Sequence, residues 1–336
     1  MIPQFSYVRP QTLKEAFKHL ETESVRLHAG GTDLLGCLHD QIFAASKVVS
    51  LSALDDLRAL SRRSDGGYRL GALLPIAELA AHEDIQQQFP ALSQAAAAVA
   101  SPQLRQQGTL GGNLCQKPRC WYYRGEFDCL RKGGPTCYAY KGQSQFHCVL
   151  GGSGCYIVHP SDTACALVAL DAQVEIQGPG GKRTVAVEDF HVLPEDDFLK
   201  ETVLDDQEIL TAVLLPAPAQ GQRSSYRKVR ARQSWDFAVA GCALALTFEG
   251  DRVHQARIAL SGAAPVPWRV QEAEDELTGR PLNADTAANA AAAAMAKAKP
   301  LKHNGYKIEL FKGLIEEELL KLTAMDYPSS SPLSIR

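Results

Sequence analysis

Six of the nine cysteines in this 336-residue chain lie between residues 115 and 155. The same stretch is rich in glycine, arginine and aromatic residues, and its apolar positions follow neither the helical nor the strand period. Such a segment has no hydrophobic core of its own to order it, so it needs another source of folding energy. We therefore expect a loop insertion that is ordered by a ligand of its thiols. The six are Cys115, Cys120, Cys129, Cys137, Cys148 and Cys155.

The setting of these thiols favours a metal centre over disulfides. The N-terminus lacks the basic and apolar regions of a signal peptide, so we expect a cytoplasmic protein, or a periplasmic one if a signal-bearing partner exports it. Disulfide frameworks are uncommon in large chains of this kind. Thiolates bind zinc or iron–sulfur clusters. The long gaps from Cys120 to Cys129 and to Cys137 suit a cluster better than the short knuckles of zinc sites.

Cations flank the thiols and would offset the negative charge of a thiolate-bound cluster. They are Arg119, Arg124, Arg131 and Lys132. Zinc and unliganded thiols remain alternatives, and spacing alone does not select which cysteines bind.

Composition excludes several function classes. Hydrophobic residues make up 45% of the chain and charged residues 22%, as in globular proteins. A net charge of −3 gives no basic surface for nucleic acid, and no apolar run is long enough to cross a membrane as a helix. The length suffices for two or three domains.

Before and after the insertion, the apolar pattern predicts alternating helices and strands. Thr12 and Glu15 form a capping-box pattern at the start of the first helix. In the first half we expect helices at 12–22, 76–81 and 91–100, and strands at 25–28, 47–51, from 68 and at 156–159. A helix should then run to Leu170.

The last third of the chain has strands followed by helices, which indicates an α+β domain after a linker at 216–223. We expect strands at 225–230, 242–248 and 253–261, and helices near 268–279, 283–298 and 306–323. Residues 328–336 are predicted to be a disordered tail. The expected domains are 1–58, 59–220 with the insertion 115–155, 221–325, and a tail at 326–336.

Two glycine-rich loops carry the strongest functional signal. The first, Ala29-Gly30-Gly31-Thr32-Asp33, directly follows a strand; the second is Gly108-Thr109-Leu110-Gly111-Gly112-Asn113. Glycine lets backbone N–H groups approach phosphate oxygens closely. Two such loops suit the two phosphates of a dinucleotide, although neither has the Rossmann or P-loop pattern. Each loop alone is equally well explained as a tight turn.

Two further elements have both a structural and a functional interpretation. In His159-Pro160-Ser161-Asp162, a side chain either caps the following helix or accepts a hydrogen bond from a ribityl or ribose hydroxyl. Lys228, Arg230 and Arg232 would share one face of a strand. That face is either solvated or places a cation near the electron-rich end of a reduced flavin.

Together these motifs resemble the FAD-binding motifs of the flavoprotein subunits of xanthine dehydrogenase and carbon monoxide dehydrogenase, in order and in spacing. The resemblance covers about residues 1 to 325. It implies an α+β (mixed α/β) fold, with a two-part FAD-binding domain of the PCMH/VAO type. A small α+β domain like the C-terminal domain of carbon monoxide dehydrogenase flavoproteins would follow.

The resemblance assigns residues to FAD. Gly30, Gly31, Thr32 and Asp33, flanked by Ala29 and Leu34, would hold one end of the pyrophosphate. Thr109, Gly111, Gly112 and Asn113 would hold the other end. Asp162 would bind the sugar chain, Leu210 would pack on the isoalloxazine, and Lys228 would lie near its polar edge.

The segment Arg119-Cys120-Trp121-Tyr122-Tyr123-Arg124, with the cysteines after it, resembles an insertion found in part of that family. It occurs in the flavoprotein subunits of 4-hydroxybenzoyl-CoA reductase and a molybdenum aldehyde dehydrogenase, where it carries a [4Fe-4S] cluster. This implies Cys120, Cys129, Cys137 and Cys155 as ligands and leaves out Cys115 and Cys148. The short gap from Cys120 to Cys129 favours the aldehyde dehydrogenase-like branch.

The family implies two partners: a large subunit with molybdopterin cytosine dinucleotide and a small subunit with two [2Fe-2S] clusters. Electrons would pass between those clusters and an external acceptor or donor, namely a quinone, ferredoxin, NAD or oxygen. The alternatives are a stand-alone FAD oxidoreductase of the same fold and a zinc-bound scaffold subunit whose glycine loops are only turns. No nucleophile–base pairing indicates catalytic side chains in this chain.

Overall fold

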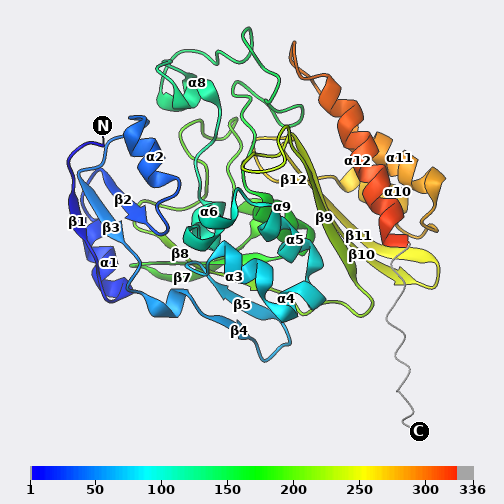
Figure 1. The fold of residues 1–336 in the computed structure, drawn as a ribbon, viewed down its shortest axis with the longest axis horizontal. Coiled ribbons are helices and arrows are strands. Elements are labelled where there is room, and N and C mark those ends of the chain that lie inside the picture. Colours follow the sequence, from blue (N-terminus) through cyan, green and yellow to red (C-terminus); the bar gives the residue numbers. More distant parts are fainter. Residues whose placement is uncertain (1, 324–336) are drawn as a thin grey trace.

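The structure is a computed structural model that describes residues 2–323, so the expected tail at 326–336 lies outside the described residues. Its strands form three sheets, which follow one another along the chain (Figure 1). None of the helices in residues 2–323 combines the length and apolar character needed to cross a membrane.

The first sheet is parallel, in the order β1 (Ser6–Val8), β3 (Lys47–Ser50), β2 (Val25–His28). It is accompanied by α1 (Leu13–Leu20) and α2 (Leu34–His39). The predicted N-cap of α1 is confirmed, because Thr12 Oγ1 accepts a hydrogen bond from the Glu15 amide at 3.2 Å. The capping box is not complete, because the Glu15 carboxylate accepts from the Gln11 amide at 2.8 Å and not from the Thr12 amide. Leu20, Val49 and Leu51 form the core beneath this sheet.

The second sheet is antiparallel, with five strands in the order β4 (Leu60–Arg62), β5 (Tyr68–Gly71), β8 (Ile209–Leu215), β6 (Gln173–Gly178), β7 (Gly181–Ala186). Its helices are α3 (Ile76–Ala81), α4 (Glu83–Gln88), α5 (Pro90–Ala98), α6 (Pro102–Gln107), α7 (Leu110–Leu114) and α9 (Asp162–Ala169). Short 3-10 turns lie at Asp55–Leu57 and Val187–Asp189. All eight residues of α9 are buried, so this helix runs through the core.

The third sheet is antiparallel, in the order β12 (Trp268–Arg269), β11 (Arg252–Ser261), β10 (Ala240–Glu249), β9 (Arg223–Val229). One face packs on α10 (Gln271–Leu277), α11 (Ala284–Met295) and α12 (Tyr306–Thr323). The other face joins the core of the second sheet. Leu244 and Leu246 of β10 face α10–α12, whereas Ala243 and Ala245 face the core that contains α5 and α9, as the two-residue strand period requires.

The insertion has little regular structure: α8 (Trp121–Arg124) and a 3-10 turn at Leu130–Lys132 are its helical parts. It projects beside α12 in Figure 1. Its last part is held against the C-terminal unit by backbone hydrogen bonds, because the amides of Val149 and Leu150 donate to the Ala263 carbonyl at 2.8 and 3.0 Å.

Three predicted elements differ from the structure. Residues 156–159 form no strand, since their backbone makes only isolated bonds, such as that from His159 N to Ala264 O at 2.9 Å. The helix expected near 268 begins at Gln271, because Trp268 and Arg269 pair with β11 instead. β9 ends at Val229, so of the three expected cations only Lys228 lies in the strand.

An ion pair with a buried carboxylate fastens β12 to α10. Arg269 Nη2 lies 2.7 Å from the Glu274 carboxylate, and the Glu274 side chain is 2% exposed. We predict that Arg269→Met lowers the free energy of unfolding by about 3 kcal/mol, because it leaves a buried carboxylate without its cation. Urea denaturation measures this. Arg280→Met, at an exposed pair with Glu276, should cost less than about 0.5 kcal/mol, and equal effects of the two changes would contradict the prediction.

Candidate functional site

A cavity of about 640 Å³ lies where the two glycine loops meet α9, β8 and β9. That volume is in the range of cofactor sites. Every residue that the sequence assigned to the flavin lines it: Ala29, Gly30, Gly31, Thr32, Asp33, Leu34, Thr109, Gly111, Gly112, Asn113, Asp162, Leu210 and Lys228. The cleft therefore draws on segments that are far apart in the sequence.

The first glycine loop is shaped to offer backbone donors. Gly31 has φ +73°, which glycine adopts without strain. A Cβ on Gly30 would lie 2.0 Å from the Gln107 carbonyl oxygen, so this loop touches the segment before the second loop. Within residues 2–323, the amides of residues 30–33 have no hydrogen-bond partner. They are therefore available to phosphate oxygens.

The second glycine loop contributes shape more than backbone donors. The Gly111 amide donates to Ala72 O at 2.7 Å, and the Gly112 amide donates to Thr109 Oγ1 at 3.2 Å. A Cβ on Gly111 would meet the Ala72 Cβ at 2.8 Å. We expected amides of both loops to bind phosphate oxygens, but only the first loop has free amides. The second loop offers the Thr109 hydroxyl hydrogen and a closely packed wall.

Asn113 has a fixed orientation in this cleft. Its Oδ1 accepts hydrogen bonds from Ser161 Oγ at 2.5 Å and from Thr163 Oγ1 at 2.7 Å. These bonds fix the orientation of the amide group, and within residues 2–323 its Nδ2 has no partner, so two N–H donors remain for a ligand. Ser161 also caps α9 by accepting from the Ala164 amide at 3.0 Å. The structural interpretation of this motif is therefore confirmed, with Ser161 as the cap, while the hydrogen bond from a sugar hydroxyl to Asp162 stays a prediction.

Asp162 and Lys228 form a buried ion pair at the cavity wall. Lys228 Nζ lies 2.7 Å from Asp162 Oδ2, and their side chains are 3% and 4% exposed. Tyr226 donates its hydroxyl to Asp162 Oδ1 at 2.6 Å. Burial raises the pKa of Asp162, which Lys228 and Tyr226 oppose. Lys228 also donates to Ala98 O at 3.2 Å, and its third N–H remains for a ligand.

The Asp33 carboxylate points to the insertion. It accepts hydrogen bonds from Arg124 Nη2 at 2.7 Å and from the Lys117 amide at 2.8 Å, and lies 2.9 Å from Arg119. A carboxylate repels phosphate, so the Asp33 backbone, and not its side chain, suits a pyrophosphate. Its side chain ties the first glycine loop to α8.

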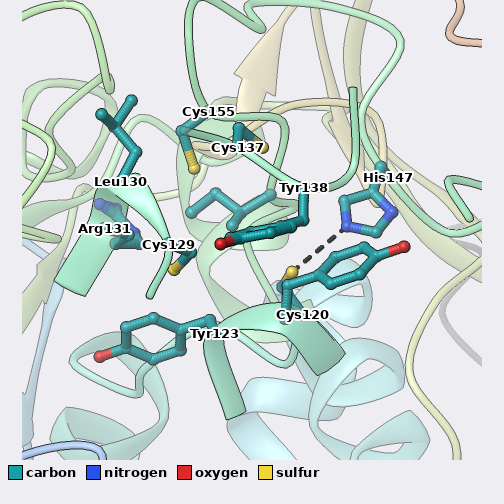
Figure 2. A pocket seen from close by; sticks show the side chains of 11 residues that line it. Cys120, Tyr123, Cys129, Leu130, Arg131, Cys137, Tyr138, His147 and Cys155 are labelled. Atoms are coloured by element: carbon teal, nitrogen blue, oxygen red, sulfur yellow. Dashed lines mark hydrogen bonds between the residues drawn. The ribbon is translucent and has the colours of Figure 1, made fainter. Parts of the chain in front are cut away.

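Four thiols border a second cavity within the insertion. Cys120, Cys129, Cys137 and Cys155 line it together with Tyr123, Tyr138, Arg131 and His147, and their sulfurs surround a common space in Figure 2. Cys148 is buried outside its wall, and Cys115 lines the flavin-type cleft instead. Among residues 2–323, no three His, Cys, Asp or Glu side chains are close enough to hold a single ion.

Backbone amides oppose the effect of burial on the pKa of Cys120, Cys137 and Cys155. Burial raises the pKa of Cys120 to about 11, which hydrogen bonds from the amides of Tyr123 and Tyr122 oppose. The pKa of Cys137 is lowered, first by its hydrogen bond with Cys155 and then by backbone amides, while that of Cys155 is raised by the same pairing. Amides aimed at sulfur are a known feature of iron–sulfur sites.

Of the four cations expected to offset the charge of a cluster, three do not line the thiol cavity. Arg119 and Arg124 pair with Asp33, and Lys132 donates to Gly125 O at 2.7 Å. Only Arg131 lines the thiol cavity, where it donates to Phe198 O at 2.8 Å and approaches Glu201 at 3.7 Å. Sequence reasoning gave His147 no role beyond that of an ordinary surface or hydrogen-bonded residue; the structure buries it, with Nε2 at 3.3 Å from Cys120 Sγ.

Comparisons with known proteins agree with this geometry. The FAD-binding domain family of molybdopterin dehydrogenases matches residues 3–218, and the carbon monoxide dehydrogenase flavoprotein C-terminal domain matches residues 224–322. The chain therefore belongs to the FAD-binding (medium) subunits of the xanthine and carbon monoxide dehydrogenase family of molybdenum hydroxylases. The α+β fold predicted from the sequence, with its two kinds of domain, is confirmed.

Several relatives extend over almost the whole chain. The aldehyde oxidoreductase FAD-binding subunit PaoB of Escherichia coli is 36% identical, over 95% of this chain and 98% of that protein. The carbon monoxide dehydrogenase medium chain of Hydrogenophaga pseudoflava is 26% identical, over 89% and 88%. The structure of quinoline 2-oxidoreductase from Pseudomonas putida 86 superposes with a TM-score of 0.76 at 25% identity, covering 97% and 100%.

Gly30 offers a sharp test of the cleft. We predict that Gly30→Ala raises the Kd for FAD at least about tenfold, or about 1.4 kcal/mol, because the new methyl group would push the first loop away from Gln107. Flavin released per chain, and FAD titration of the deflavinated protein, measure it. Gly36→Ala in α2 is the control, since its Cβ would meet nothing within 4 Å. Unchanged FAD affinity in Gly30→Ala would contradict the assignment.

Proposed function

We propose that this chain is the FAD- and [4Fe-4S]-carrying electron-transfer subunit of a heterotrimeric molybdenum hydroxylase. The observation that carries the cluster assignment is one cavity lined by the thiols of Cys120, Cys129, Cys137 and Cys155. Bound FAD would supply one- and two-electron redox chemistry. The substrate chemistry would lie in a partner subunit, since the cleft offers donors and an ion pair but no nucleophile with a base.

The cleft's own residues account for binding a dinucleotide flavin. The free amides of residues 30–33 and the Thr109 hydroxyl suit the pyrophosphate, and the Asn113 amide adds two oriented donors. Leu210 gives an apolar surface for the ring system. Lys228 would hold positive charge near the edge of the flavin that becomes electron-rich on reduction, and its ion pair with Asp162 fixes its position.

The four thiols around one cavity match the number of ligands that a [4Fe-4S] cluster takes. Its sulfurs border a shared space, they receive backbone N–H groups, and the buried Arg131 adds positive charge. The two cavities are also close along the chain. Residues 115–117 and Arg119 line the cleft, and Cys120 follows at once. The five residues from Cys115 in the cleft to Cys120 in the thiol cavity span at most about 18 Å, so the backbone limits how far apart the two proposed cofactor sites can be.

The relatives support a role within a complex. They are described as FAD-binding subunits or medium chains, of an aldehyde oxidoreductase and of carbon monoxide dehydrogenases among others. We propose that this chain joins a large molybdopterin cytosine dinucleotide subunit and a small subunit with two [2Fe-2S] clusters. It would pass electrons between those clusters and an external acceptor or donor. The 36% identity to PaoB favours an aldehyde as the substrate class of the complex.

Cys120→Ser tests the cluster assignment. In the purified complex we expect this change to remove about four irons from the chain and to lower its melting temperature, because cluster binding supplies folding energy to the insertion. Iron, sulfide and FAD analysis with thermal unfolding measure it. Cys148→Ala is the matched control: it lies in the same insertion but outside the cavity, and should keep all the iron. Full iron in Cys120→Ser, or equal loss in both variants, would refute the assignment.

A further inference from the structure

Lys307 is a fully buried lysine in the first turn of α12. Its Nζ donates to the backbone carbonyls of His147, at 3.2 Å, and of Gly262. Within residues 2–323 no carboxylate forms an ion pair with it. Neutral carbonyls satisfy two of its N–H groups but leave its charge uncompensated.

Both its burial and its place in the helix disfavour a charge here. Taking an ammonium out of water is costly unless an opposite charge accompanies it. The first turn of a helix is also the positive end of the helix dipole, which repels cations. Burial lowers the pKa of Lys307 to about 8, so the ammonium remains the majority form at neutral pH. The neighbouring side chain that favours its charge is the thiol of Cys148, but burial raises the pKa of that thiol to about 12, so it is neutral near pH 7. A buried cation in this position therefore points to an anion from outside the protein side chains around it.

The contacts of Lys307 lead to the thiol cavity. The residue whose carbonyl it binds, His147, lines that cavity, and His147 Nε2 lies 3.3 Å from Cys120 Sγ. Lys307 therefore binds the backbone of a residue whose side chain lines the cavity. Arg131 is the other buried cation here, and it already has Glu201 at 3.7 Å. Lys307 has no such neighbour in the described part of the chain.

We infer that Lys307 is the buried counter-charge of the thiol-held cluster and raises the reduction potential of that cluster. The inference rests on the proposed function, because it requires a cluster in this cavity. Four thiolates give an iron–sulfur cluster a net negative charge, and each added electron makes it more negative. A nearby fixed cation stabilises the reduced form more than the oxidised form. Lys307 is thus a positioning residue that acts through the field and not through a bond to the cluster.

A purely structural role is the competing explanation. Asn304 already binds the same segment, since its Nδ2 donates to His147 O at 3.0 Å and to Cys148 O at 2.9 Å. Lys307 would then be one more tie between α12 and the insertion. The two explanations differ in one respect. A structural hydrogen bond to the His147 carbonyl needs only an N–H donor, whereas a counter-charge needs the positive charge.

The experiment measures the cluster's reduction potential in the complete purified complex, by a redox titration followed by EPR. Lys307→Met and Lys307→Gln should each disfavour reduction by at least about tenfold, which is about 59 mV for a one-electron couple. Gln keeps an N–H donor for the His147 carbonyl but lacks the charge. A wild-type potential in Lys307→Gln with full iron would overturn the inference. The control Lys312→Met, on an exposed part of the same helix, should leave the potential unchanged.

Iron content separates the possible failures. Wild-type complex without a cluster in this chain would refute the proposed function itself. If neither neutral variant retains iron, Lys307→Arg decides the question. Full iron with a wild-type potential would then support the counter-charge, whereas loss of iron from Lys307→Arg would overturn it.

Discussion

The cleft depends on one close approach of two backbone segments. Gly30 lies so near the Gln107 carbonyl oxygen that even a methyl group would not fit between them. This contact brings the end of β2 against the start of the second glycine loop, so that residues from both the first and the second sheet face one cavity. Close approach of backbone, and not flexibility as such, is the reason for glycine at this position.

The insertion depends in turn on that cleft and on the C-terminal unit, because it has almost no core of its own. At one end, Arg124 of α8 binds the carboxylate of Asp33, which belongs to the first glycine loop. At the other end, Asn304 binds two carbonyls of the insertion. An insertion held by two neighbours in this way can keep its thiols in place with little regular structure. Asp33 would thereby couple the order of the flavin loop to that of the thiol cavity.

Sequence reasoning predicted correctly those features that depend on a few neighbouring residues. Thr12 as a cap, the strand at 242–248 and the two glycine loops were all local signals, and the structure has them at or within two residues of the predicted positions. Long-range partners gave no such signal. Nothing in the sequence shows that Asp33 pairs with Arg124 and Arg119. From the sequence, these two arginines were expected to offset the negative charge of a thiolate-bound cluster. The short strand at Trp268–Arg269 was missed because two residues show no period.

The C-terminal unit takes part in both cavities through buried cations on opposite sides of its sheet. β9 places Lys228 against Asp162 in the cleft, and α12 places Lys307 on the backbone of His147, whose side chain lines the thiol cavity. The first charge is compensated by a protein carboxylate, so it adds a fixed dipole to the cleft before any ligand arrives. The second has no protein carboxylate beside it among the described residues, so its full field acts on whatever the thiols bind. A domain that contributes no cysteine to the thiol cavity can in this way influence the redox properties of a group held there.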